Sequence, residues 1–187
     1  MSKERILEIS KREGLSHIGS CLSAYDIIEE IYKKKKPDEK FILSAGHAHL
    51  AHALVMGRED MPAGIHCDKE NGCDVSTGSL GQGLPIALGI ALADRERDVY
   101  CLISDGECAE GSIWEALRIK SELQVTNLQV YVNSNGYGAY GEINQDVLEA
   151  RLRIFCPDIN FRRTRVDKEI LEKYPQLEGL NGHYKTI

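Results

Sequence analysis

Two apolar segments on either side of an amphipathic one constrain the fold of this chain most. Residues 99–103 and 128–132 are short, apolar and rich in β-branched side chains, which is typical of buried strands. Residues 112–123, between them, repeat their apolar side chains with helical spacing. A right-handed β-α-β crossover makes the two strands parallel neighbours, so the loops that follow them leave the sheet at the same carboxyl edge. Open α/β sheets bind their ligands at that edge.

The rest of the chain extends this unit into an α/β fold, a parallel sheet with helices on both faces, and we expect one domain over residues 1–187. The apolar content of 42% suits a packed core. Ser23 is the expected N-cap of a helix that follows a loop over residues 14–22. The apolar helix that ends at Ala93 is expected to be central. Further helices are predicted over residues 2–12, 145–152 and 168–174 and before Met56, and further strands over residues 41–43, 160–166 and, at the sheet edge, 184–187.

The charge balance excludes two classes of partner. The chain has 29 acidic and 23 basic residues and a formal net charge of −6, which offers no basic surface to nucleic acid or to an anionic membrane. The N-terminal residues lack the apolar core of a signal peptide, and the longest apolar run, residues 84–93, is about half the length that spans a bilayer. We therefore expect a cytoplasmic protein that acts on small molecules.

The cysteines allow two interpretations. None of the six belongs to a CxxC pair, and their neighbours are apolar or glycine-rich, so the first interpretation is reduced, mostly buried thiols. The second is a zinc site made by Cys67, Cys73 and His66, which lie close together in the sequence. Their spacing fits no common structural zinc pattern.

Two hard oxygen ligands follow the strands of the β-α-β unit. Asp105 comes after the first strand and Asn135 after the second. Mg²⁺ prefers carboxylate, amide, carbonyl and phosphate oxygens, and flexibility at Gly136 would let the Tyr137 carbonyl turn toward the same ion. Gly106 would let the backbone approach a phosphate near a helix N-terminus. Each dipeptide alone is an ordinary turn, but their placement on adjacent strand ends predicts a site for a magnesium-chelated diphosphate.

Four motifs also resemble a known family. Residues 104–107 (Ser-Asp-Gly-Glu) and 110–116, with Asn135 and Gly136 further on, resemble the thiamine diphosphate motif of transketolases. Residues 14–20, 43–47 and 76–83 are similar to three other signatures of that family, in the same order. The resemblance covers residues 14–141 and implies the N-terminal, diphosphate-binding domain of a transketolase. Ser104 is a departure, because the family has glycine there, and we expect altered affinity rather than loss of binding.

The resemblance assigns roles to individual residues. It implies that Asp105, Asn135 and the Tyr137 carbonyl bind the metal. It places His17, His47 and His66 in the channel that holds sugar hydroxyls, and Glu110, with Glu115, where two cofactor sites are coupled. The implied catalytic set is therefore His17, His47, His66 and Glu110, and the implied cofactor contacts are His47, Gly78, Ser79, Leu80, Gly106, Glu107 and Asn135.

The resemblance also implies a missing part. A transketolase needs a second, pyrimidine-binding domain, which these residues do not supply, and residues 142–187 are shorter than the family's corresponding stretch. We therefore expect a split enzyme, completed by a separate pyrimidine-binding subunit of the transketolase C-terminal type, as a homodimer or heterotetramer. Its reaction would transfer a two-carbon ketol unit from a sugar or sugar phosphate to an aldehyde. The alternatives are a 2-keto acid decarboxylase, a deoxyketose synthase, and a non-catalytic scaffold or regulatory protein.

Overall fold

The sheet of this protein is parallel, as the β-α-β unit predicts. The computed structural model describes residues 3–58, 66–138 and 140–187, so the predicted start of the first helix at Ser2 lies outside the described residues. Within these residues, four strands pair in the order β1-β2-β3-β6, and each pair is parallel. The strands are β1 (Lys40–Leu43), β2 (Val99–Ser104), β3 (Leu128–Ser134) and β6 (Asn160–Arg163).

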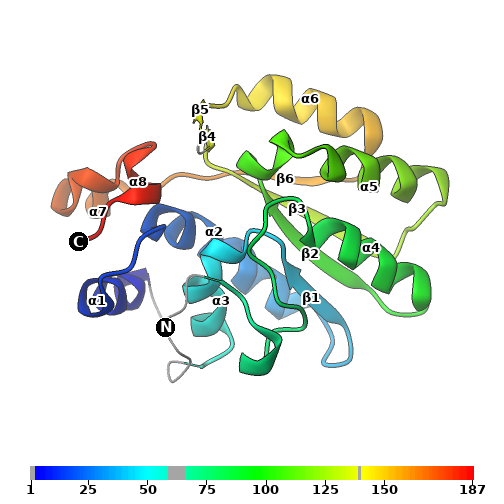
Figure 1. The fold of residues 1–187 in the computed structure, drawn as a ribbon, viewed down its shortest axis with the longest axis horizontal. Helices are drawn as coiled ribbons and strands as arrows, with labels where there is room; N and C mark the ends of the chain where they lie inside the picture. The colour runs from blue at the N-terminus through cyan, green and yellow to red at the C-terminus, as the bar shows by residue number, and fades with distance from the viewer. Residues whose placement is uncertain (1–2, 59–65, 139) are drawn as a thin grey trace.

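Helices cover both faces of this sheet and create a core on each (Figure 1). Side chains alternate along a strand, so Tyr100 and Leu102 of β2 join one core while Cys101 and Ile103 join the other. The first face is covered by α1 (Lys3–Glu13), α2 (Ile18–Lys34) and α3 (His49–Val55). The second face is covered by α4 (Gly83–Ala93), α5 (Gly111–Glu122) and α6 (Gln145–Phe155). The predicted fold class is confirmed.

The helix α4 differs from its prediction. Its sequence is apolar on nearly every side, which predicted a central helix. Leu84, Ala87 and Ala91 are indeed buried against the sheet, but Ile86 is 39% exposed. The helix therefore covers the sheet with one side and leaves an apolar side open to solvent.

The start of α2 corrects another prediction. The helix begins at Ile18 rather than after Ser23, so residues 18–22 are helical and not part of a loop. Ile18 and Leu22 are buried, and this packing outweighs the capping signal. Ser23 lies inside the helix, where its hydroxyl donates a 3.2 Å hydrogen bond to the carbonyl of Ser20.

The C-terminal segment folds back over the carboxyl edge of the sheet. After β6 come α7 (Lys168–Lys173), a 3₁₀ turn η4 (Pro175–Leu177) and α8 (Asn181–Tyr184), which lies beside α2 (Figure 1). Gly182 and Gly19 allow this contact, because a Cβ at Gly19 would lie 3.2 Å from the Gly182 Cα. The predicted edge strand at 184–187 is wrong, since Tyr184 ends a helix and no strand follows.

Short elements follow three of the strands at the carboxyl edge: η1 (Gly46–Ala48) after β1, η3 (Gly106–Ala109) after β2, and the hairpin of β4 (Tyr137–Gly138) and β5 (Gly141–Glu142) after β3. The turn η2 (Lys69–Asn71) lies in the segment before α4. Among the helices of the described residues, none has the length and apolar character needed to cross a membrane.

Candidate functional site

The carboxylate of Asp105 joins the two loops that the sequence placed at one edge. Asp105 follows β2 and is 1% exposed. Its Oδ2 accepts hydrogen bonds from the Gly136 N–H at 2.7 Å and from the Ser134 hydroxyl at 3.1 Å, both at the end of β3. Its Oδ1 accepts one from the Gly106 N–H at 3.0 Å. The predicted meeting of these loops is therefore present in the structure.

Burial disfavours the ionised form of the Asp105 carboxyl. Loss of solvent raises the pKa of this carboxyl from 3.8 to about 6, although the hydrogen bonds from Gly136, Ser134 and Gly106 act in the opposite direction. A carboxylate keeps acceptor sites beyond the three that these donors occupy. A nearby cation would stabilise its ionised form.

The turn after β3 presents two further oxygens. Asn135 Oδ1 accepts a 3.0 Å hydrogen bond from the Tyr137 N–H, and Gly136 between them has a φ of +89°, which favours glycine. Asn135 and Tyr137 line two neighbouring cavities, of about 570 and 170 Å³. The smaller cavity is also lined by Asp105 and Gly106, so the predicted metal ligands lie together at this edge.

Histidines line the smaller cavity. His17, His47 and His66 all border it, so the structure brings the three predicted channel histidines together. The rings of His17 and His47 lie 5.2 Å apart, between centroids. Burial first, and then the neighbouring His17, His183 and His66, lowers the pKa of His47 from 6.5 to about 3. His47 is therefore neutral at physiological pH and can both donate and accept a hydrogen bond.

The backbone of His17 is held in an uncommon conformation. Its φ of 60° and ψ of 25° are left-handed, which costs energy for a residue other than glycine. Its N–H donates to the His183 carbonyl at 3.1 Å, and its Nδ1 lies 3.0 Å from the Ser16 hydroxyl. Burial lowers the pKa of His17 as well. These contacts fix the ring at the cavity wall.

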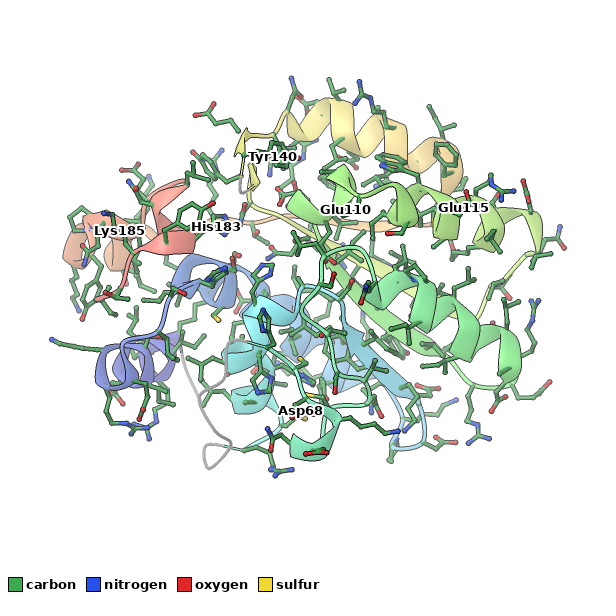
Figure 2. All side chains as sticks on the ribbon, viewed as in Figure 1. Asp68, Glu110, Glu115, Tyr140, His183 and Lys185 are labelled. Atoms are coloured by element: carbon green, nitrogen blue, oxygen red, sulfur yellow. The ribbon has the colours of Figure 1, made fainter. Side chains whose placement is uncertain are left out.

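His183 is a site residue that no sequence motif predicted. This residue of α8 lines both cavities, and its ring lies 6.3 Å from His17 and 6.5 Å from His47. Its Nδ1 lies 3.2 Å from the Ser20 hydroxyl on α2. Figure 2 shows its position where the C-terminal segment meets the sheet edge. No local motif surrounds it, so only the fold brings it to the site.

The segment before α4 forms another wall. Gly78 and Leu80 line the smaller cavity, whereas Ser79 is exposed and does not line either cavity. A Cβ at Gly78 would lie 2.9 Å from the His66 ring, so only glycine fits. A Cβ at Gly83 would lie 2.5 Å from the Ser44 Cα. These glycines let the segment pack closely on its neighbours.

Like Ser79, two further predicted site residues, Glu107 and Glu110, lie outside both cavities. Glu107 is fully buried, and its carboxylate accepts hydrogen bonds from the Ser44 hydroxyl (2.7 Å), the Gly81 N–H (2.9 Å) and the Ser104 N–H (3.0 Å). Glu107 therefore connects the loops that contain Ser44, Gly81 and Ser104, from a position outside both cavities. Glu110 is exposed at the start of α5, with Glu115 further along that helix (Figure 2).

Comparison with known proteins identifies the class to which this fold and site belong. Residues 61–152 match the family model "Thiamine pyrophosphate enzyme, C-terminal TPP binding domain". Among solved structures, transketolase from Leishmania mexicana has a TM-score of 0.64 over 83% of this chain and 31% of its own, at 20% identity. A Pichia stipitis transketolase mutant in complex with fructose-6-phosphate is 25% identical, with a TM-score of 0.64 over 75% of this chain and 27% of its own.

Curated relatives then give the particular family. Transketolase of Homo sapiens is 33% identical in an alignment that covers 96% of this chain and 34% of the enzyme. The "6-deoxy-6-sulfo-D-fructose transketolase subunit SqwG" of a Clostridium strain is 31% identical over 80% of this chain and 66% of that subunit. The chain belongs to the transketolase family. It spans only 25% to 34% of the length of the first transketolases and transketolase-like proteins that it matches.

Proposed function

We propose that residues 1–187 form the diphosphate-binding subunit of a split, thiamine diphosphate-dependent transketolase-like enzyme. The enzyme would transfer a two-carbon ketol unit from a ketose to an aldehyde acceptor. The observation that carries this proposal is the hydrogen bond of 2.7 Å that joins Asp105 to the Asn135–Tyr137 turn, beside a cavity lined by histidines.

The oxygen atoms at this edge fit Mg²⁺. The Asp105 carboxylate, the Asn135 amide oxygen and the Tyr137 carbonyl are hard ligands of the kind this ion prefers. Burial of Asp105 supports the assignment, because a bound cation would offset the cost of its ionised form. Phosphate oxygens and water would complete the six ligands.

The cavities provide room for the diphosphate. The larger one, of about 570 Å³, is within the range of small-molecule sites, and its charged lining residues are Arg165, Lys168, Glu142 and Glu178. Gly106 begins η3 at the smaller cavity, beside Gly78 and Leu80. We propose that these residues and His47 contact the cofactor, and that Glu107 acts as a positioning residue beneath them.

The histidines suit a sugar substrate. When bound, thiamine diphosphate supplies the nucleophilic carbon that ketol transfer requires. His17, His47 and His183 have lowered pKa values, chiefly through burial, so their neutral rings can each donate and accept one hydrogen bond at sugar hydroxyls. They would orient the sugar and exchange protons with it. This favours a sugar or sugar phosphate over a 2-keto acid.

The serine that replaces the family's glycine is accommodated. The Ser104 N–H donates to Glu107 Oε2 at 3.0 Å, and the Ser104 hydroxyl accepts from the Glu107 N–H at 3.3 Å. Its side chain thus takes part in the turn that holds Glu107. This weakens one of the two arguments for a non-catalytic scaffold, the other being the reduced length of the chain.

A separate partner chain is part of the proposal. The chain covers 34% of human transketolase, and a relative of which it covers 66% is described as a transketolase subunit. We propose that a pyrimidine-binding chain docks at the carboxyl edge, and that two copies of the present chain associate through the exposed apolar side of α4.

Reconstitution tests the proposal. The chain, with Mg²⁺ and thiamine diphosphate, is assayed for ketol transfer from a ketose phosphate to an aldose, alone and with a candidate pyrimidine-binding chain. We expect product only from the mixture, and His47→Gln should lower kcat by about tenfold or more. The variant Asp38→Asn, in the loop before β1, is the control. Product from the chain alone would contradict the split enzyme, and binding without product in any mixture would favour a scaffold.

A further inference from the structure

Four side chains of residue types that often bind metals meet in the core beside the smaller, histidine-lined cavity, which we call the cofactor cavity. His49 and His52 lie on α3, and Cys67 and Cys73 lie on the segment that leads toward α4. One ligand atom from each residue lies within 4.8 Å of the other three. All four residues are buried, with exposed fractions between 1% and 5%. We call this group the His/Cys cluster.

The distances within the His/Cys cluster are those of a nearly formed tetrahedral site. Cys67 Sγ and Cys73 Sγ each lie 3.8 Å from His52 Nδ1, and Cys73 Sγ lies 3.8 Å from His49 Nδ1. Zinc bonds of about 2.0 to 2.3 Å place tetrahedral ligand atoms about 3.3 to 3.8 Å apart. The site therefore needs only a small contraction to hold an ion.

A neighbouring tyrosine orients one of the histidines. The Tyr32 hydroxyl lies 2.7 Å from His52 Nε2, which leaves Nδ1 of the same ring facing the two sulfur atoms. Metal-binding histidines usually engage their second nitrogen in this way, which fixes the tautomer and the direction of the ring. Tyr32 thus gives an argument for a metal that is independent of the ligand distances.

We propose that the His/Cys cluster binds a structural zinc ion. Two neutral imidazoles would bind through Nδ1 and two thiolates through Sγ, so binding of Zn²⁺ releases two protons from the thiols. Four protein ligands close the coordination shell and leave no position for a substrate, which is typical of structural zinc. Cys67 and Cys73 belong to this cluster, but His66, which the sequence paired with them, lines the cofactor cavity instead.

The zinc ion would hold two walls of the cofactor cavity together. His47 precedes His49 by two residues, and His66 directly precedes Cys67, so each side of the cluster is next to a cavity histidine. The Thr77 N–H donates to the Cys67 carbonyl at 3.1 Å and connects the cluster to Gly78. The ion would therefore fix residues 67–78 against α3.

Metal analysis of the full-length chain tests the proposal. The chain is purified under reducing conditions, incubated with zinc, desalted and measured by mass spectrometry of its metal content. We expect about one zinc per chain. Replacement by Co²⁺ should give the visible bands of a tetrahedral site and a thiolate-to-cobalt charge-transfer band, which the cavity histidines alone would not produce.

Matched variants locate the ion. Cys73→Ala and His49→Gln should each lose the zinc and the charge-transfer band, and the chain should unfold at a lower temperature. Cys101→Ala, which alters a buried cysteine outside the cluster, should keep both. If Cys73→Ala fails to fold, His49→Gln and the cobalt spectrum of the unaltered chain still decide. A metal-free chain after reconstitution, a Cys67–Cys73 disulfide under these conditions, or zinc retained in both variants would overturn the proposal.

Discussion

The Gly136 N–H donates a 2.7 Å hydrogen bond to Oδ2 of Asp105 and so joins the loops that follow β2 and β3. This bond makes the two adjacent strand ends one structural unit. It also fixes the Asn135–Tyr137 turn beside the buried carboxylate. The smaller cavity, which histidines line, is next to both. The proposed cofactor site depends on this arrangement.

Loss of Glu107 should destabilise the fold more than loss of an exposed glutamate. Glu107→Ala removes the acceptor of three hydrogen bonds and leaves buried donors on Ser44, Gly81 and Ser104 without it. We expect the free energy of unfolding to fall by about 3 kcal/mol or more in urea titrations. Glu115→Ala, at an exposed ion pair with Arg118, should cost less than about 1 kcal/mol. Equal costs would argue against the role of Glu107 as the tie between site loops.

Acid should destabilise the chain through its buried histidines. Below pH 6.5 the unfolded chain protonates His47, but the folded chain does not until the pH approaches 3. The unfolded state therefore binds more protons in this window, and the free energy of unfolding falls as pH falls, by about 1.4 kcal/mol per pH unit for each such proton. His17 and His183 act in the same direction.

The variant His47→Gln isolates this effect. Urea titrations of this variant between pH 6.5 and 4 should show a shallower dependence of the free energy of unfolding on pH than those of the unaltered chain. The variant lacks one histidine that binds a proton in the unfolded state but not in the folded state. Identical slopes for the two chains would mean that His47 is protonated in the folded state.

A charge on the open side of α4 should prevent self-association. Ile86 is 39% exposed in the first turn of an apolar helix, and burial of an aspartate there would be costly. Ile86→Asp should shift the chain toward the monomer in sedimentation experiments. Ile154→Asp, on α6, is the control, because Ile154 is 78% exposed and lies away from the proposed interface. Unchanged association in Ile86→Asp would contradict an interface at α4.

Local patterns were enough to predict the centre of the fold. The apolar strands at 99–103 and 128–132 and the helix between them determine the parallel pair and its loops, because handedness leaves one arrangement. The predicted start of α2 was wrong because the side chain of Ser23 can cap a helix, whereas burial of Ile18 and Leu22 favours a longer helix. Packing between distant segments decides such boundaries.

The candidate site likewise contains residues that local motifs predict and residues that only the fold brings together. Asp105, Asn135 and His17 lie in local motifs, so their positions followed from sequence. His183 has no such motif and reaches the cavity only because Gly182 packs on Gly19. His49 and His52 joined Cys67 and Cys73 only in the folded chain, since no zinc spacing connects the two pairs in sequence.

Calorimetric titration with thiamine diphosphate tests the central claim most directly. The chain and its Asp105→Asn variant are titrated with and without Mg²⁺, and Asp38→Asn is the control. We expect binding that requires Mg²⁺ in the unaltered chain and the control, and that weakens by about tenfold or more in Asp105→Asn. Binding that does not depend on Mg²⁺, or that is as tight in Asp105→Asn as in the unaltered chain, would contradict a magnesium-diphosphate site at Asp105.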